Sequence, residues 1–323
     1  MESVIAALTA SQISRFFSAN GPERIIEQPA IPAPVQGGTN YTVIAGEYVV
    51  QFRAPNAVLN LEFLGHVEKA YHCFMPCHSD SGTFGELFVY KMRNVGGVSL
   101  YLARDSLYRN GCFLLQQTVM DFTRFFASAW QKTPKAIPVS DRRLLHCKYM
   151  TQHSQLSAGL PERFRPMLNR LLPRLQYITA VEWPLVPNHI DLLENNIHVD
   201  PSTGKLTGVC DWAGTEVSPF GMSLGAVENM LGIPKLDRES GRTDHVYHAN
   251  HRELSDLFYD ELYSAMGSVS DRDKECIEDA ILVGLFLTNA WRYDGAGNQL
   301  PAGEEEHGLQ HLDAVLRATS DGY

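Results

Sequence analysis

The stretch Asn188-His189-Ile190-Asp191-Leu192-Leu193-Glu194-Asn195-Asn196-Ile197-His198-Val199-Asp200 is followed, after a short turn, by Gly208-Val209-Cys210-Asp211-Trp212. The β-rich runs at 197–200 and 206–210 flank the turn residues Pro201-Ser202-Thr203-Gly204-Lys205, and this pattern predicts a hairpin. The predicted hairpin connects a polar loop, which carries Asp191 and Asn196, to a second carboxylate at Asp211.

These three polar side chains suit metal-assisted phosphoryl transfer. The reaction needs a carboxylate that orients the acceptor hydroxyl and receives its proton, and hard oxygen ligands that hold Mg²⁺ beside the nucleotide phosphates. Asp191 supplies one carboxylate, Asn196 follows it by five residues with an amide oxygen, and Asp211 adds the second carboxylate. An isolated Asp-x-x-x-x-Asn is common in turns, so only the whole arrangement is informative.

The order His-x-Asp-x-x-x-x-Asn, hairpin, Asp-Trp resembles the catalytic and metal-binding loops of the aminoglycoside phosphotransferase and choline-kinase-related families. Pro219-Phe220-Gly221, together with Leu224, resembles the branch common in filamentous fungi. The resemblance covers residues 35 to 295, and it implies that Asp191 is the catalytic base. It further implies that Asn196 and Asp211 bind Mg²⁺ and that His189 braces the loop.

One position of this loop departs from the family pattern. The family has glycine between the histidine and the aspartate, whereas this chain has Ile190. Because a β-branched residue does not readily adopt positive φ, we expect the loop to be shaped differently here.

The N-terminal part of the chain resembles the nucleotide site of the same family. Gly37-Gly38-Thr39-Asn40-Tyr41 is similar to the nucleotide loop, where small residues let backbone N–H groups approach phosphates. Gln51 aligns with the phosphate-gripping lysine of kinases, and Arg53 should face the same side of the strand. The resemblance therefore implies an ATP site built from Gly37, Gly38, Asn40, Gln51, Arg53, Tyr90 and Met92.

Two parts of this nucleotide site remain open from the sequence. Either Glu62 or Glu68 could be the helix partner of the strand cation, and solvated surface charge is the alternative for both. The segment Phe88-Val89-Tyr90-Lys91-Met92 resembles the hinge that meets adenine through backbone groups, and the alternative is an ordinary core strand.

The periodicity of the whole chain predicts an α+β, two-lobed, protein-kinase-like fold. Residues 1–92 should form a β-rich N-lobe, with an N-terminal helix at 3–18, a hairpin at 41–52, a helix at 59–71 and a strand at 86–92. Residues 93–323 should form a helical C-lobe that carries the catalytic-loop hairpin. Helices are predicted there at 113–130, 161–178, 254–266, 271–291 and 304–319.

Composition and charge argue against two classes of function, nucleic-acid binding and membrane insertion. The net charge of −10 argues against nucleic-acid binding, which needs clustered Lys and Arg. No apolar run approaches the ~20 residues of a membrane helix, and the N-terminus lacks the features of a signal peptide, so we expect a cytoplasmic protein without a membrane partner. The six cysteines are expected to be reduced.

Three further patterns are expected to be structural rather than metal-binding or catalytic. The cluster at 72–78 holds two histidines and two cysteines, but no second cysteine pair accompanies it, so we expect a helix end that runs through Pro76 into a strand. His245, His248 and His251 are expected in a polar segment before a helix. Ser223 lies in a G-x-S-x-G, which we expect to be a loop that opens a helix rather than a nucleophile elbow.

The expected function is therefore an ATP- and Mg²⁺-dependent phosphotransferase of secondary metabolism that acts on a hydroxyl of a small molecule. The alternative is a kinase-fold protein that has lost phosphoryl transfer. Such a protein would bind a ligand or catalyse another step of natural-product biosynthesis. Gln51 and Ile190 motivate this alternative, because fold does not fix function.

Overall fold

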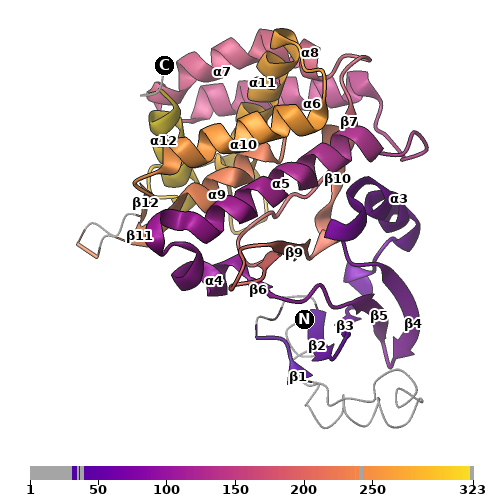
Figure 1. Cartoon of the computed structure of the whole chain (residues 1–323). Coiled ribbons are helices and arrows are strands. Elements are labelled where there is room, and N and C mark those ends of the chain that lie inside the picture. The colour runs from indigo at the N-terminus through magenta and orange to yellow at the C-terminus, as the bar shows by residue number, and fades with distance from the viewer. Residues whose placement is uncertain (1–30, 35, 37–39, 237, 240–242, 321–323) are drawn as a thin grey trace.

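The computed structural model describes residues 31–34, 36, 40–236, 238–239 and 243–320. The helix predicted at 3–18 and the glycines Gly37 and Gly38 lie outside these ranges. Within them, a sheet near the N-terminus leads into a larger helical body (Figure 1). None of the described helices is long and apolar enough to span a bilayer.

The N-terminal sheet has five antiparallel strands in the order β1-β2-β3-β5-β4. Its strands are β1 (Ile31–Pro32), β2 (Asn40–Ala45), β3 (Tyr48–Arg53), β4 (His78–Phe84) and β5 (Leu87–Arg93). The predicted hairpin is confirmed as β2 and β3, which turn at Gly46 with a positive φ of 58°. Alternate side chains of these strands form a small core on one face, made of Val43, Val50, Phe52, Leu87 and Val89.

Helix α3 (Leu61–Tyr71) connects β3 to β4 and packs against the helical body. The Asn60 side chain caps it by accepting a hydrogen bond from the Phe63 N–H. Leu64, Val67 and Tyr71 recur at helical spacing and are buried. The Tyr71 hydroxyl donates to the carbonyl of Pro187, next to the predicted catalytic loop. The helix therefore connects the sheet to the segment that carries the site.

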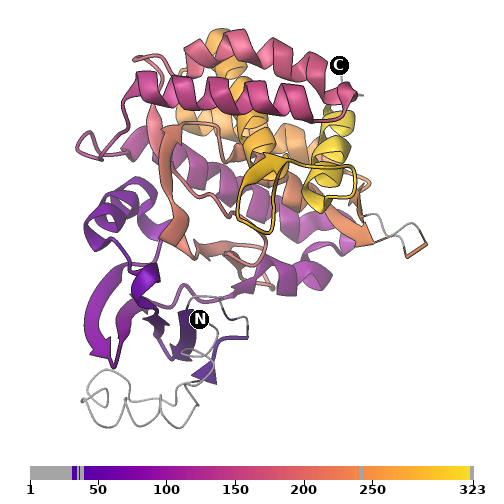
Figure 2. The same cartoon turned by 180° about the vertical axis from the view of Figure 1, so that it is seen from behind.

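The helical body is built around the long helix α5 (Phe113–Lys132), which lies beside α10 (His251–Met266) (Figures 1 and 2). Aromatic rings of both helices meet in the core, where the centroids of Phe126 and Phe258 are 6.1 Å apart. The remaining helices are α4 (Leu100–Leu107), α6 (Arg142–Gly159), α7 (Arg165–Leu171), α8 (Leu175–Ile178), α9 (Glu228–Leu231), α11 (Asp271–Asn289) and α12 (His307–Ser320).

In the part of the chain that the structure describes, four small sheets accompany the helices. The predicted hairpin of the site is confirmed as β8 (Ile197–Val199) and β9 (Leu206–Val209), and β6 (Val98–Ser99) adds a third strand. The other three pairs are β7 (Leu185–Asn188) with β10 (Glu216–Pro219), β11 (Gly232–Leu236) with β12 (Thr243–Tyr247), and β13 (Trp291–Tyr293) with β14 (Gln299–Pro301).

The helices predicted at 59–71, 113–130, 254–266, 271–291 and 304–319 are confirmed as α3, α5, α10, α11 and α12, with small differences at their ends. The single helix predicted at 161–178 is wrong, because the segment is divided into α7, α8 and short 3₁₀ turns. Pro173 lies at the break, where it has no N–H to donate to an α-helical hydrogen bond.

Candidate active site on the loop between β7 and β8

The loop that follows β7 is fixed at its start by Asn188. This buried amide donates to the backbone carbonyls of Ser218 (3.1 Å) and Pro219 (3.2 Å) on β10. Its oxygen accepts from the Ser223 hydroxyl at 2.8 Å. Ser223 is therefore committed to a structural hydrogen bond at the start of a short 3₁₀ turn, although a strand, β10, does precede it.

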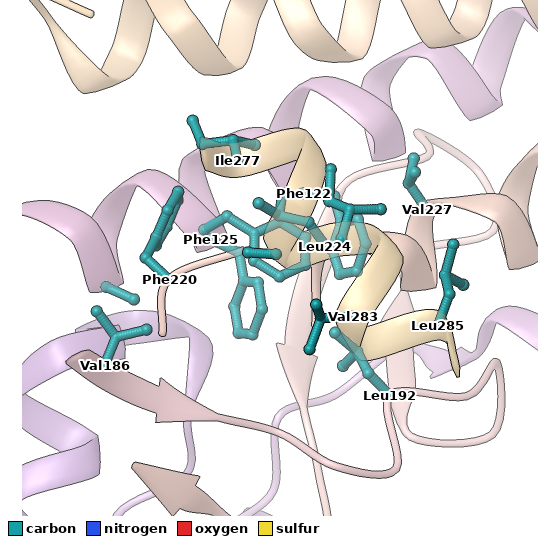
Figure 3. Close-up of a cluster of buried hydrophobic side chains, with 14 of the residues drawn as sticks. Phe122, Phe125, Val186, Leu192, Phe220, Leu224, Val227, Ile277, Val283 and Leu285 are labelled. Atoms are coloured by element: carbon teal, nitrogen blue, oxygen red, sulfur yellow. The ribbon is translucent and has the colours of Figure 1, made fainter. Parts of the chain in front are cut away.

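The middle of the same loop is held by Leu192. Its side chain is buried in the main hydrophobic cluster, which includes Val283 and Leu285 of α11 (Figure 3). The Asn229 amide donates to the Leu192 carbonyl at 3.4 Å. Because Leu192 points inward, its neighbours Asp191 and Leu193 are both exposed.

His189 connects the loop to the strand end that precedes Asp211. Its Nε2 lies 2.8 Å from the Cys210 carbonyl, and its Nδ1 accepts the Asp191 N–H at 3.2 Å. Both bonds are satisfied by the neutral ring with its proton on Nε2. Burial lowers the pKa of His189, and the neighbouring carbonyl and the carboxylates of Asp211 and Asp191 oppose that shift. The brace thus holds the Asp191 loop against the strand end that precedes Asp211.

Asp191 and Asn196 are joined across the loop. The Asn196 amide donates to the Asp191 backbone carbonyl at 2.8 Å and to its carboxylate at 3.1 Å. The Asn196 carbonyl accepts the Cys210 N–H at 2.8 Å. Asn196 therefore contacts both Asp191 and the strand end before Asp211, and within the described ranges its Oδ1 accepts no hydrogen bond.

Asp211 follows β9 in a left-handed backbone conformation, with φ 59° and ψ 63°. Non-glycine residues rarely adopt this region, and such outliers gather at functional sites. The next residue, Trp212, is buried with its ring centroid 4.9 Å from that of His189. The turn at Asp211 thus exposes the carboxylate while the tryptophan anchors the backbone.

Ile190 does not strain the loop. Positive φ occurs among the described non-glycine residues at His72, Asn110, Cys112 and Asp211, and therefore not at Ile190. The Cδ1 atom of Ile190 lies so close to Gly214 that a β-carbon there would meet it at 2.7 Å. The loop accommodates the β-branched residue by laying it over the turn that follows Asp211.

Arg53 is the cation of the sheet that lies near Asp211. It is buried, and its Nη1 donates to Gln51 Oε1 at 2.8 Å, so both side chains face the same side of β3 as expected. Its Nε donates to the Ala57 carbonyl at 2.7 Å. Burial lowers the pKa of the Arg53 guanidinium, and the negative charge of Asp211 opposes this. Within the described ranges no carboxylate lies within 4.0 Å of Arg53.

His78, from the cluster at 72–78, lies within electrostatic range of Arg53 and Asp211. Its charge interacts with those of Arg53 and Asp211, and burial lowers its pKa to about 4. Its Nδ1 is buried and has no hydrogen-bond partner in the part of the chain that the structure describes. Only the fold brings His78 to the site, because no local pattern marks it.

Three other residues of the predicted nucleotide site lie in the sheet. Asn40 is buried opposite Arg53 in the β2–β3 register. Tyr90 pairs with Gln51 on one side, and its hydroxyl accepts the Leu59 N–H at 3.1 Å. Met92 lies on the same strand as Tyr90, β5. Their contact with a nucleotide stays a prediction.

Glu62 and Glu68 do not pair with Arg53. Both line a cavity of about 670 Å³ between α3, the turn that follows it and the end of β5, together with Arg93 and the exposed thiols of Cys73 and Cys77. This cavity lies beside α3 and does not include the Asp191 loop. In the described ranges, no group of three or more His, Cys, Asp or Glu side chains could hold a metal ion.

The donor atoms still fit Mg²⁺. Asp211 offers a carboxylate and Asn196 an unused amide oxygen, and Mg²⁺ is usually held by one or two protein carboxylates, with water and nucleotide phosphates completing its shell. Arg53 adds positive charge on the side of the sheet. These residues could hold a metal–nucleotide pair, with Asp191 beside it.

The sheet, helix α3 and the helical body with its loop and hairpin define a kinase-like α+β fold. The chain matches the crystal structure of a Ralstonia eutropha protein assigned to the aminoglycoside phosphotransferases, with 13% identity and a TM-score of 0.53. The match covers 94% of this chain and 95% of that one. It therefore shows the fold of that group of enzymes.

Two further solved structures are similar at lower TM-scores. An aminoglycoside phosphotransferase of Streptomyces rimosus, in complex with ADP and streptomycin, has 16% identity and a TM-score of 0.48 over 83% of this chain and 98% of that one. A choline/ethanolamine kinase family protein of Mesorhizobium loti has 13% identity and a TM-score of 0.47 over 86% of each chain. No protein-family model and no curated protein sequence matches the chain.

Proposed function

We propose that this protein is an ATP- and Mg²⁺-dependent phosphotransferase that acts on a hydroxyl of a small molecule. The observation that carries the proposal is the His189 brace, which joins the Asp191 loop to the strand end before Asp211 by two hydrogen bonds. We further propose that the lobes divide between residues 92 and 93 and that the enzyme is cytoplasmic and belongs to secondary metabolism, in the branch common in filamentous fungi.

Each residue then has a defined role. Asp191 orients the acceptor hydroxyl and receives its proton, while His189, held neutral by burial, keeps Asp191 in place. Asn196 and Asp211 would hold Mg²⁺, and Arg53 would take over the phosphate contact that lysine makes in kinases. When bound, ATP would supply the phosphoryl group, and Mg²⁺ would neutralise the charge that develops on it. Gly37, Gly38, Asn40, Gln51, Tyr90 and Met92 complete the proposed nucleotide site.

Thermal shift with Mg-ATP, Mg-ADP and Mg²⁺ alone tests the nucleotide site. At a hundredfold excess over Kd, a ligand of the native state adds about 2.7 kcal/mol, which is several degrees in Tm. We expect this shift with either nucleotide, and we expect Asp211→Ala to lose it. Asp271→Ala, at a fully exposed carboxylate on α11, is the matched control. No shift in the wild type would contradict ATP binding.

Turnover tests the base. We expect Asp191→Ala to lower kcat by roughly 10²–10⁴-fold, the range that a positioned general base contributes. Because Asp191 is exposed, its Tm should stay close to that of the wild type. An Asp191→Ala enzyme with normal kcat would refute the mechanism.

The second candidate function is a kinase-fold protein without phosphoryl transfer. Gln51 favours this second function, because it is an uncharged amide at the position where kinases have lysine. Its Oε1 already accepts a hydrogen bond from Arg53. The two candidates differ in the same thermal shift. If neither nucleotide raises the Tm but a hydroxylated natural product does, the protein binds a ligand without phosphoryl transfer.

A further inference from the structure

The exposed side chains closest in sequence to Asp191 are aliphatic. Ile190 is 54% exposed and Leu193 is 50% exposed, whereas Leu192 between them is buried. Because consecutive Cα atoms are about 3.8 Å apart, the Cα of Leu193 lies at most about 7.6 Å from that of Asp191. Two exposed aliphatic side chains therefore lie within two residues of Asp191 on the same loop.

A tyrosine ring is exposed at the start of α4, with the Arg104 guanidinium 4.7 Å from its centroid. The Tyr101 N–H at the start of α4 donates to the Glu194 carbonyl at 3.4 Å, which fixes α4 against the loop. The Tyr101 ring is exposed as well. The loop that carries Asp191 and the first turn of α4, which is bonded to it, thus expose aliphatic and aromatic side chains.

The next carboxylate along the loop, Glu194, is already paired. Glu194 is held by Arg104 through two hydrogen bonds, one of them 2.8 Å from Nε to Oε1. The Tyr108 hydroxyl donates to the same Oε1 at 3.3 Å. A bidentate arginine pair of this kind satisfies the negative charge, so Glu194 offers little to a cationic ligand.

The buried acid behind the loop is also unsuited to a cation. Burial raises the pKa of Glu228 to about 7, and its Oε2 accepts a hydrogen bond from Tyr247 at 2.8 Å. Glu228 directly precedes Asn229, whose amide holds the Leu192 carbonyl. Glu194 and Glu228 therefore offer no free carboxylate to a polycationic substrate.

From this arrangement we propose that the acceptor site takes a neutral alcohol with a largely apolar body, rather than a polycationic amino sugar. The proposal rests on the proposed function in one respect, which is that the ligand's hydroxyl meets Asp191. Ile190 and Leu193 are then the residues that select the apolar body.

Binding by ligand-observed NMR tests this class of ligand without requiring turnover. The probes are geraniol, a neutral apolar alcohol, and streptomycin, a polycationic one, each with and without Mg-ATP. We expect geraniol to bind and streptomycin not to compete with it. The double variant Ile190→Ser/Leu193→Ser should weaken geraniol binding about tenfold, the loss expected from two half-buried aliphatic side chains.

The control is Val181→Ser, which removes an aliphatic side chain that is 79% exposed and outside the proposed site. It should bind geraniol like the wild type. Tighter binding of streptomycin than geraniol, equal geraniol affinity in the double variant, or no geraniol binding would each overturn the proposal. ADP release separates the two ideas. If geraniol binds at this site but is not phosphorylated, the proposed phosphoryl transfer is refuted and the apolar acceptor site is not. If streptomycin is phosphorylated and geraniol is not, the apolar acceptor site is refuted and phosphoryl transfer is not.

Discussion

At the scale of single residues, Asp211 is the most constrained member of the site. Its left-handed backbone costs an L-residue roughly 1–2 kcal/mol, because Cβ approaches the following carbonyl oxygen. Asp tolerates this conformation better than most residues. The conformation is held by the β8–β9 hairpin and by buried Trp212, so the strain is offset by packing elsewhere.

This predicts different outcomes for two substitutions that both remove the carboxylate. Asp211→Gly should be more stable than Asp211→Ala by about 1 kcal/mol, since glycine adopts positive φ without a steric cost but is more flexible when unfolded. Both should lose the Mg-ATP shift. Urea unfolding of the two variants measures the difference. Equal stability would mean that the turn relaxes and that Asp211 is not strained.

Local residue patterns predicted the site only in part. Spacing along one loop and one hairpin places Asp191, Asn196 and Asp211 on one frame, whereas the brace by His189 was only implied by the family resemblance. Arg53 was predicted only as a cation that could replace the positive charge that Gln51 lacks. Its buried position depends on how the sheet meets the helical body. His78 begins β4, which the whole of α3 separates from β3 in the sequence, so no spacing rule relates it to the site.

At the scale of elements, α3 is the connection between the sheet and the site. The Tyr71 ring stacks on Phe125 at 4.4 Å, and its hydroxyl donates to the Pro187 carbonyl. The Ser128 hydroxyl of α5 donates to the Ala70 carbonyl at 2.8 Å. The C-terminal end of α3 is thus bonded to the body on two sides.

Tyr71→Phe removes one of these bonds and keeps the ring. We expect a loss of about 1–3 kcal/mol in the free energy of unfolding, because the buried Pro187 carbonyl loses a donor. Chemical denaturation measures this. Tyr293→Phe, at an exposed tyrosine of β13, should change stability by less than about 0.5 kcal/mol. A similar small change in Tyr71→Phe would show that the hydroxyl bond adds nothing.

Elements with strong periodicity were predicted, and weakly patterned ones were not. Helix α6 was missed because it is rich in polar residues and buries only Leu145, Tyr149, His153 and Leu156. Strand β10 was missed because it is four residues long and ends in Pro219. Its pairing with β7 depends on a partner far away in the sequence, which a local pattern does not reveal.

At the scale of the whole molecule, several histidines are kept neutral by burial. Burial lowers the pKa of seven of them, namely His78, His153, His189, His198, His245, His248 and His311. Below pH ~6.5 the unfolded chain binds protons at these positions that the folded chain excludes. Stability therefore falls as the pH drops from about 6.5 toward 4. Glu228 acts in the opposite sense, since its raised pKa removes stability as the pH rises from about 4.5 to 7.

Because seven histidines oppose one strongly shifted acid, we expect the free energy of unfolding to decrease between pH 6.5 and 4.5. His78→Gln should flatten this dependence, since it removes a group whose folded pKa is about 4. His72→Gln, at an exposed histidine, is the control. Urea titrations across this pH range measure the slope. A flat profile in the wild type would disprove the account.

The two hydrophobic clusters of the molecule differ greatly in size. The sheet keeps only a small cluster of its own on one face, whereas α3 shares the large cluster of the helical body. A unit with few buried apolar contacts opens locally at a lower free energy than the rest. Amide protons of β2 and β3 should therefore exchange with deuterium well before those of α3 and α5, and the sheet should act as a separately opening cover over a rigid base.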